Sequence, residues 1–261
     1  MTLPDRPVSS RRCLAEGSII APLEVASATE IVPQLTRVPA RFPAMSSEIP
    51  YSAIAEVREI TRTDFKSAYY ATYLESAGKL DDALRELETA RELDPLSTSP
   101  INLLALCYFF RRDYDKALEQ WRKSLEISPN SAIAHWNLFS VYMAKSMPGE
   151  AIRELEQRLK LKGRTDDAKR ISESYQHGGW REALRVLAQI SEKPASKSYD
   201  PWEVATVYSY LGDKDQAFAW LRKAIEARTS FVDYLRVDPS WDNIRSDPRF
   251  AELVRRTGLP E

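Results

Sequence analysis

Residues 101–129 read INLLALCYFFRRDYDKALEQWRKSLEISP, and this stretch decides the fold. Leu104 and Tyr108 lie four residues apart within an apolar run, which places them on one face of a helix. A short polar break follows. Ala117 and Trp121 then begin a second apolar stripe with the same spacing. The stretch therefore predicts two helices joined by a tight turn.

The second-helix pattern recurs along the chain with a period of about 34 residues. Its small first residue is 34, 34, 32 and 34 residues from the next one, in the series Ala83, Ala117, Ala151, Ala183 and Ala217. A large residue nine positions upstream keeps the same register in four units, as Leu74, Tyr108, Tyr142 and Tyr208. Two series with one shared period indicate a repeat protein built from helical hairpins. Pro95 and Pro129 follow the first two hairpins, where proline stops a helix from continuing.

These residues resemble the tetratricopeptide repeat (TPR) family. The second unit fits best, with Leu104, Ala105, Tyr108, Ala117, Trp121 and Pro129. The third unit departs from the family pattern, because Phe139 and Arg158 stand where small residues are usual and Gly163 replaces the closing proline. The resemblance implies an all-α, right-handed solenoid of about five hairpin units, near residues 64–97, 98–131, 132–163, 164–197 and 198–231.

The closing segment, residues 232–261, predicts a capping helix. Asp247 suits the N-cap, Pro248 the first helical position, and Gly258 the C-terminal end. A solenoid needs such an element to cover its last apolar face. The segment also resembles the end of TPR regions in bacterial winged-helix regulators, serine/threonine kinases and cyclases. That resemblance implies an alternative role, as a sensory or regulatory module acting with a separately encoded kinase or transcription regulator.

Residues 1–50 differ from the rest in composition. They hold seven of the 16 prolines and a single aromatic residue, Phe42, so we expect a disordered leader before a solenoid over 51–261. Two alternative interpretations of this segment remain. Arg11-Arg12 could belong to an export signal, and translation could begin at Met45. No apolar run is long enough to span a membrane. We therefore expect a cytoplasmic protein, with a periplasmic location as the alternative.

The composition offers little material for catalysis or metal binding. There are 37 basic and 38 acidic residues, giving a net charge of -1, two cysteines and two histidines. The basic residues alternate with acidic ones, so nucleic acid is not an expected partner. No phosphate-binding loop, nucleophile elbow or zinc-helix motif occurs. The sequence predicts a non-enzymatic chain without a catalytic, cofactor or metal site, and we expect Cys107 and His135 to be packed.

The TPR resemblance implies a concave surface lined by the first helix of each unit. The corresponding positions hold Lys or Arg nowhere, which argues against a clamp for a terminal carboxylate. The predicted partner-binding residues are Asn102, Leu106, Phe109, Phe110, Trp136, Met143, Trp202 and Tyr210. Their aromatic character suits an apolar peptide or amphipathic helix of a partner protein. Two alternatives stay open: the aromatics pack within the solenoid, or residues 1–44 fold back into the groove.

Overall fold

The computed structural model describes residues 64–95, 97–192 and 200–258. The chain divides into two units, residues 1–42 and residues 43–261, and every described residue belongs to the second. The predicted leader, residues 1–50, therefore lies outside the described residues.

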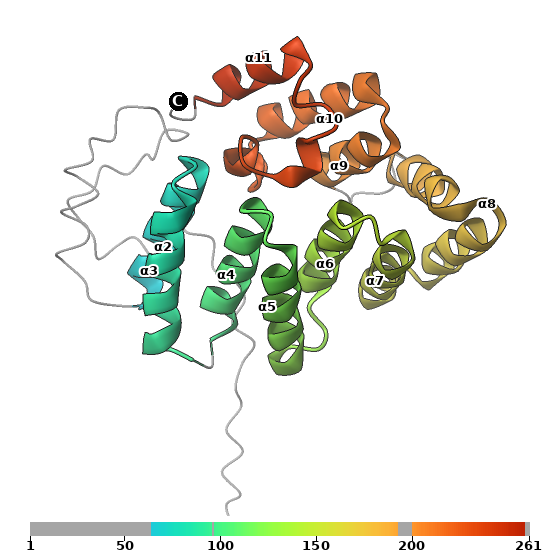
Figure 1. Cartoon of the computed structure of the whole chain (residues 1–261). Coiled ribbons are helices and arrows are strands. Elements are labelled where there is room, and N and C mark those ends of the chain that lie inside the picture. The colour runs from blue at the N-terminus through green and yellow to red at the C-terminus, as the bar shows by residue number, and fades with distance from the viewer. Residues whose placement is uncertain (1–63, 96, 193–199, 259–261) are drawn as a thin grey trace, which may run out of the picture. The chain divides into compact units, whose positions relative to one another are not determined.

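Successive helices pack side by side as hairpins (Figure 1). The pairs are α2 (Asp64–Ser76) with α3 (Leu80–Leu93), α4 (Thr98–Phe110) with α5 (Tyr114–Ile127), α6 (Ala132–Ala144) with α7 (Pro148–Leu161), and α9 (Pro201–Leu211) with α10 (Lys214–Ala227). Each pair also packs against the next element along the chain. No residue in the described ranges belongs to a strand. The predicted all-α solenoid is confirmed.

The fourth hairpin is a single bent element, α8 (Thr165–Ser191). Its backbone leaves the helical conformation at Gly179, where φ is 73° and ψ is -172°. Residues with a side chain rarely adopt this conformation, so glycine allows the chain to turn here without a loop. The two arms of α8 pack between α7 and α9, which keeps the repeat continuous.

The repeating alanines explain how the helices approach one another. All five alanines that define the period are completely buried, at 0% exposure: Ala83, Ala117, Ala151, Ala183 and Ala217. A methyl side chain allows two helix backbones to lie close together, and larger neighbours such as Trp121 fill the adjacent space. The repeat of alanines in the sequence therefore corresponds to a repeat of close helix–helix contacts in the structure.

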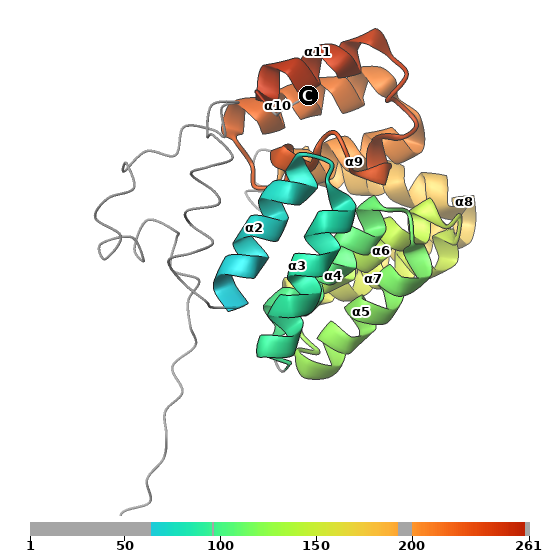
Figure 2. The ribbon, with the colours of Figure 1, turned by 60° about the vertical axis from the view of Figure 1, so that its left-hand side comes forward.

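The chain after α10 does more than cap the last unit. It contains two short 3-10 helices, η2 (Val232–Tyr234) and η3 (Pro239–Trp241), followed by α11 (Pro248–Thr257). Asp247 caps α11 by accepting the Arg249 N–H. We call residues 229–245 the strap. The strap packs on α9 and also contacts α2 and α6 (Figures 1 and 2), which the sequence did not predict.

Candidate functional site

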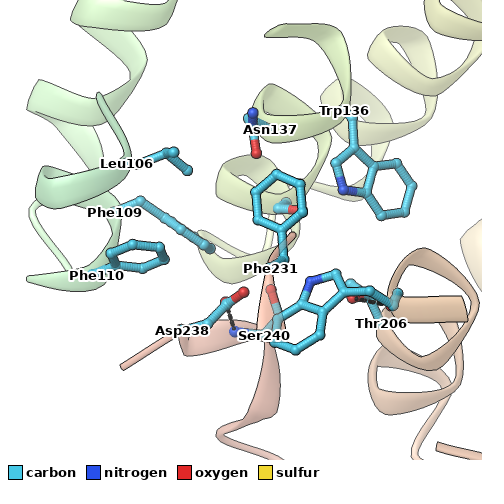
Figure 3. Close-up of a pocket in the computed structure, with 11 residues that line it drawn as sticks. Leu106, Phe109, Phe110, Trp136, Asn137, Thr206, Phe231, Asp238 and Ser240 are labelled. Carbon is cyan, nitrogen blue, oxygen red and sulfur yellow. Dashed lines mark hydrogen bonds between the residues drawn. The ribbon is translucent and has the colours of Figure 1, made fainter. Parts of the chain in front are cut away.

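The inner face of the solenoid is formed by the first helices of the hairpins, and it holds the predicted partner-binding residues. Asn102, Leu106, Phe109 and Phe110 lie on α4, Trp136 and Met143 on α6, and Trp202 and Tyr210 on α9. Five of the eight line one pocket, namely Leu106, Phe109, Phe110, Trp136 and Trp202 (Figure 3). Asn102, Met143 and Tyr210 are outside its lining.

Aromatic side chains of the strap occupy this face. The Tyr234 ring packs on Phe110 of α4 with 4.9 Å between ring centroids. Phe231 stacks on Trp202 of α9 at 6.4 Å, and Trp241 meets the same indole edge-on at 4.7 Å. Such edge-to-face and offset arrangements are the favoured geometries of aromatic pairs. The groove therefore holds a segment of its own chain.

Hydrogen bonds join the strap to α9, and one of the α9 residues involved also bonds to α6. The Tyr210 hydroxyl donates to the Ser140 carbonyl oxygen at 3.2 Å and lies 3.1 Å from the Ser240 hydroxyl. The Ser209 hydroxyl donates to the Ser240 carbonyl oxygen at 2.6 Å. The Asp238 carboxylate accepts the Ser240 N–H at 2.8 Å, and burial raises its pKa to about 6. These bonds satisfy the N–H, carbonyl and hydroxyl groups of Ser240 where η3 lies against α9.

The strap leaves little of the aromatic surface exposed. Phe110 is 1% exposed, Trp202 3%, Phe109 4% and Trp136 5%. The free space in the pocket is about 10 Å³, which is enough for about one water molecule. Leu106, by contrast, is only partly buried and lies at the pocket wall. The four aromatic side chains are therefore almost completely covered in the folded chain.

A buried ion pair beside this face was missed by the sequence reasoning. Arg158 of α7, 2% exposed, forms an ion pair with Glu203 of α9 and stacks over the Trp136 ring at 4.6 Å. The only sequence signal was an arginine at a repeat position where small residues are usual. Because a buried arginine needs a paired anion, that signal could have prompted a search for an acidic partner.

A buried carboxyl group lies where the strap meets α2. Glu75 is 0% exposed, and burial raises the pKa of its carboxyl to about 8. The Cys107 thiol and the Tyr234 hydroxyl lie against it and oppose that rise in part. Glu75 is thus held largely protonated at neutral pH.

The two titratable side chains that the sequence singled out, His135 and Cys107, have local partners or are buried. His135 Nδ1 lies 2.6 Å from a carboxylate oxygen of Glu154, and Cys107 is buried. The described residues contain no group of three or more His, Cys, Asp or Glu side chains arranged to hold a metal ion. None of the helices in the described ranges has the length and apolar character needed to cross a bilayer.

Comparison with known proteins agrees with the repeat geometry. Tetratricopeptide repeat family models match residues 101–131 and residues 202–231, which contain the α4–α5 and α9–α10 hairpins. The chain therefore contains tetratricopeptide repeats in these two ranges. TPR proteins are generally non-enzymatic interaction scaffolds, in line with the predicted absence of catalysis and the predicted role in binding proteins.

Among solved structures, the chain matches YrrB, described as a TPR protein with an unusual peptide-binding site. The match is 20% identical and covers 70% of this chain and 96% of YrrB, with a TM-score of 0.42. A search of curated protein sequences gives no match. The resemblance of the closing segment to winged-helix regulators, kinases and cyclases stays a prediction.

Proposed function

We propose that this TPR protein binds an apolar, aromatic segment of a partner protein on its concave face. The residues proposed to contact the partner are Asn102, Leu106, Phe109, Phe110, Trp136, Met143, Trp202 and Tyr210. The single observation that carries the proposal is the strap, because a short peptide segment already occupies this face in the folded chain.

The strap indicates which chemistry the face accepts. Its contacts with the face are aromatic rings on aromatic rings, and its Ser240 carbonyl oxygen accepts a hydrogen bond from the Ser209 hydroxyl of α9. Aromatic anchors in desolvated pockets, surrounded by weaker contacts, are typical of peptide-binding interfaces. A partner segment with aromatic or large aliphatic anchors meets the same requirements.

Leu106 offers the sharpest test of this proposal because it is partly exposed at the pocket wall. We expect Leu106→Asp to reduce recovery of cross-linked, co-purified partner proteins at least ten-fold, since the charge would be buried on binding. Leu93→Asp is the matched control, because Leu93 is 60% exposed at the end of α3. Quantitative mass spectrometry of the recovered proteins is the readout.

A second groove variant keeps the test decisive if Leu106→Asp destabilises the fold. Met143 of α6 is also partly exposed, so Met143→Lys should reduce recovery of the same proteins. Circular dichroism and thermal melting establish that each variant is folded. Unchanged recovery of the same partners by both folded groove variants would overturn the groove assignment.

A further inference from the structure

The strap is anchored unequally to the two sides of the groove. Leu235, Trp241 and Ile244 are 0% exposed and belong to one apolar cluster with Phe218 and Leu221 of α10. A side chain buried this completely contributes several kcal/mol when compared with its truncation. This half of the strap is therefore part of the core of the last repeat unit.

On the side of α2 and α4, the strap has one buried aromatic contact and one exposed ion pair. The Tyr234 ring, 6% exposed, packs on Phe110, and its hydroxyl lies against Glu75 of α2. The Arg112 guanidinium donates to both carboxylate oxygens of Asp242, at 2.8 and 3.1 Å, but these side chains are 46% and 43% exposed. Exposed ion pairs contribute little to stability even when the geometry is good. Attachment on this side therefore depends on the Tyr234 ring, whereas three fully buried side chains anchor the other side.

The junction with α4 depends on one side chain. Arg112 follows the end of α4, in the turn of the hairpin. Its guanidinium also donates to the Phe110 carbonyl oxygen at 3.2 Å. The same residue therefore links the end of α4, through its side chain, to Asp242 of the strap. Opening at this point would expose Phe110.

We propose that the strap is a built-in competitor for the partner: it detaches from α2 and α4 while remaining packed on α9 and α10, and an aromatic side chain of the partner then takes the place of Tyr234 on Phe110. This inference rests on the proposed function of the concave face and adds its regulation. The partner class is a protein segment that presents an aromatic residue within a turn, as η2 does.

The dimensions of the pocket support competition rather than simultaneous binding. With Phe231, Asp238 and Ser240 of the strap among its lining residues, the pocket has free space for about one water molecule (Figure 3). An aromatic ring is far larger than this space. A partner ring therefore reaches Phe110 only after the Tyr234 ring has left it.

The test uses a fluorescent synthetic peptide of residues 229–240 and the full-length chain. In the chain variant Tyr234→Ala the Phe110 ring lacks its internal partner, so we expect this variant to bind the peptide at least ten-fold more tightly than the unmodified chain. The same peptide with its tyrosine replaced by alanine should lose that gain. Tyr175→Ala is the matched control, because Tyr175 packs on the α7–α8 side near Gly149. Fluorescence anisotropy gives the dissociation constants.

A surface variant covers the case in which Tyr234→Ala does not fold. Asp242→Ala removes the exposed ion pair with Arg112 without creating a cavity, and we expect peptide binding two- to five-fold tighter than in the unmodified chain. Folded variants that bind the peptide no better than the unmodified chain overturn the competition. If peptide binding is unchanged while partner recovery still depends on Leu106, the inference about the strap is wrong but the proposed function stands. If peptide binding tightens but recovery is independent of Leu106 and Met143, the proposed function fails.

Discussion

The buried carboxyl of Glu75 makes the stability of this protein dependent on pH in a direction that can be calculated. In the unfolded chain the group ionises near its ordinary pKa of 4.5, whereas in the folded chain burial raises the pKa to about 8. Between these values the folded chain holds a proton that the unfolded chain has released. The contribution of Glu75 to stability is therefore fully present below pH 4.5 and is lost as the pH rises through 8.

The size of the effect follows from the same two values. A difference of one in pKa corresponds to about 1.4 kcal/mol, so a change from 4.5 to about 8 gives an upper limit of about 5 kcal/mol. The loss should accumulate at up to about 1.4 kcal/mol per pH unit across this range. Glu75→Gln keeps a side chain of the same shape that stays neutral. The stability of the Glu75→Gln variant should therefore not change with pH through this position.

The assay is urea denaturation followed by circular dichroism at pH 5, 6, 7 and 8. We expect the free energy of unfolding of Glu75→Gln, minus that of the unmodified chain, to increase steadily with pH. Taking this difference cancels other titrations, including that of Asp238, whose pKa is also raised. Glu88→Gln, at an exposed position of α3, should show no such trend. A constant difference from pH 5 to 8 for Glu75→Gln would refute the reasoning.

Three further predictions concern packing and backbone conformation. Glu203→Gln should lower the free energy of unfolding by about 3 kcal/mol in chemical denaturation, because it leaves the Arg158 charge buried without its partner. Adding Arg158→Met to this variant should restore most of the lost stability. Trp241→Ala should cost about 3–5 kcal/mol in the same assay, since the indole is 0% exposed in the core of the last unit. Gly179→Ala should lower stability by roughly 1–3 kcal/mol, because its φ of 73° with ψ of -172° is strained for any residue with a side chain; an unchanged melting temperature would contradict this.

The repeat architecture could be predicted because its sequence signals lie close together in the chain and recur in every hairpin. Each period places an alanine where helices must approach closely, and all five of these alanines are fully buried in the structure. Helix ends were also readable, since Asp247 and Gly258 cap α11 as their residue types predict. Such signals need only the residues within one hairpin or one helix end.

The filling of the groove could not be predicted, because it depends on contacts between distant residues. Tyr234 packs on Phe110 and Arg112 pairs with Asp242, 130 residues further along the chain. Neither contact belongs to the repeat period, so periodicity carries no information about it. The aromatic residues of the concave face were identified, but the segment that covers them was assigned only to capping the last unit.

The buried ion pair shows a similar limit. Arg158 stood out as a departure from the repeat, yet its partner Glu203 lies 45 residues away on a helix of another unit. A residue that violates a local pattern marks a position where tertiary contacts have decided the choice. The sequence could therefore locate the exception but not its partner.

Hydrogen–deuterium exchange of the full-length chain, read by mass spectrometry, tests the central claim most directly, namely that the strap occupies the concave face and can leave it. The account predicts that residues 231–238 exchange more slowly than an unprotected segment but faster than α6, and that Asp242→Ala accelerates their exchange while leaving α6 unchanged. Exchange of the strap at the rate of an unprotected segment would show that it does not occupy the face. Exchange of the strap only together with α6, in both proteins, would show that it is a fixed part of the core and does not compete with a partner.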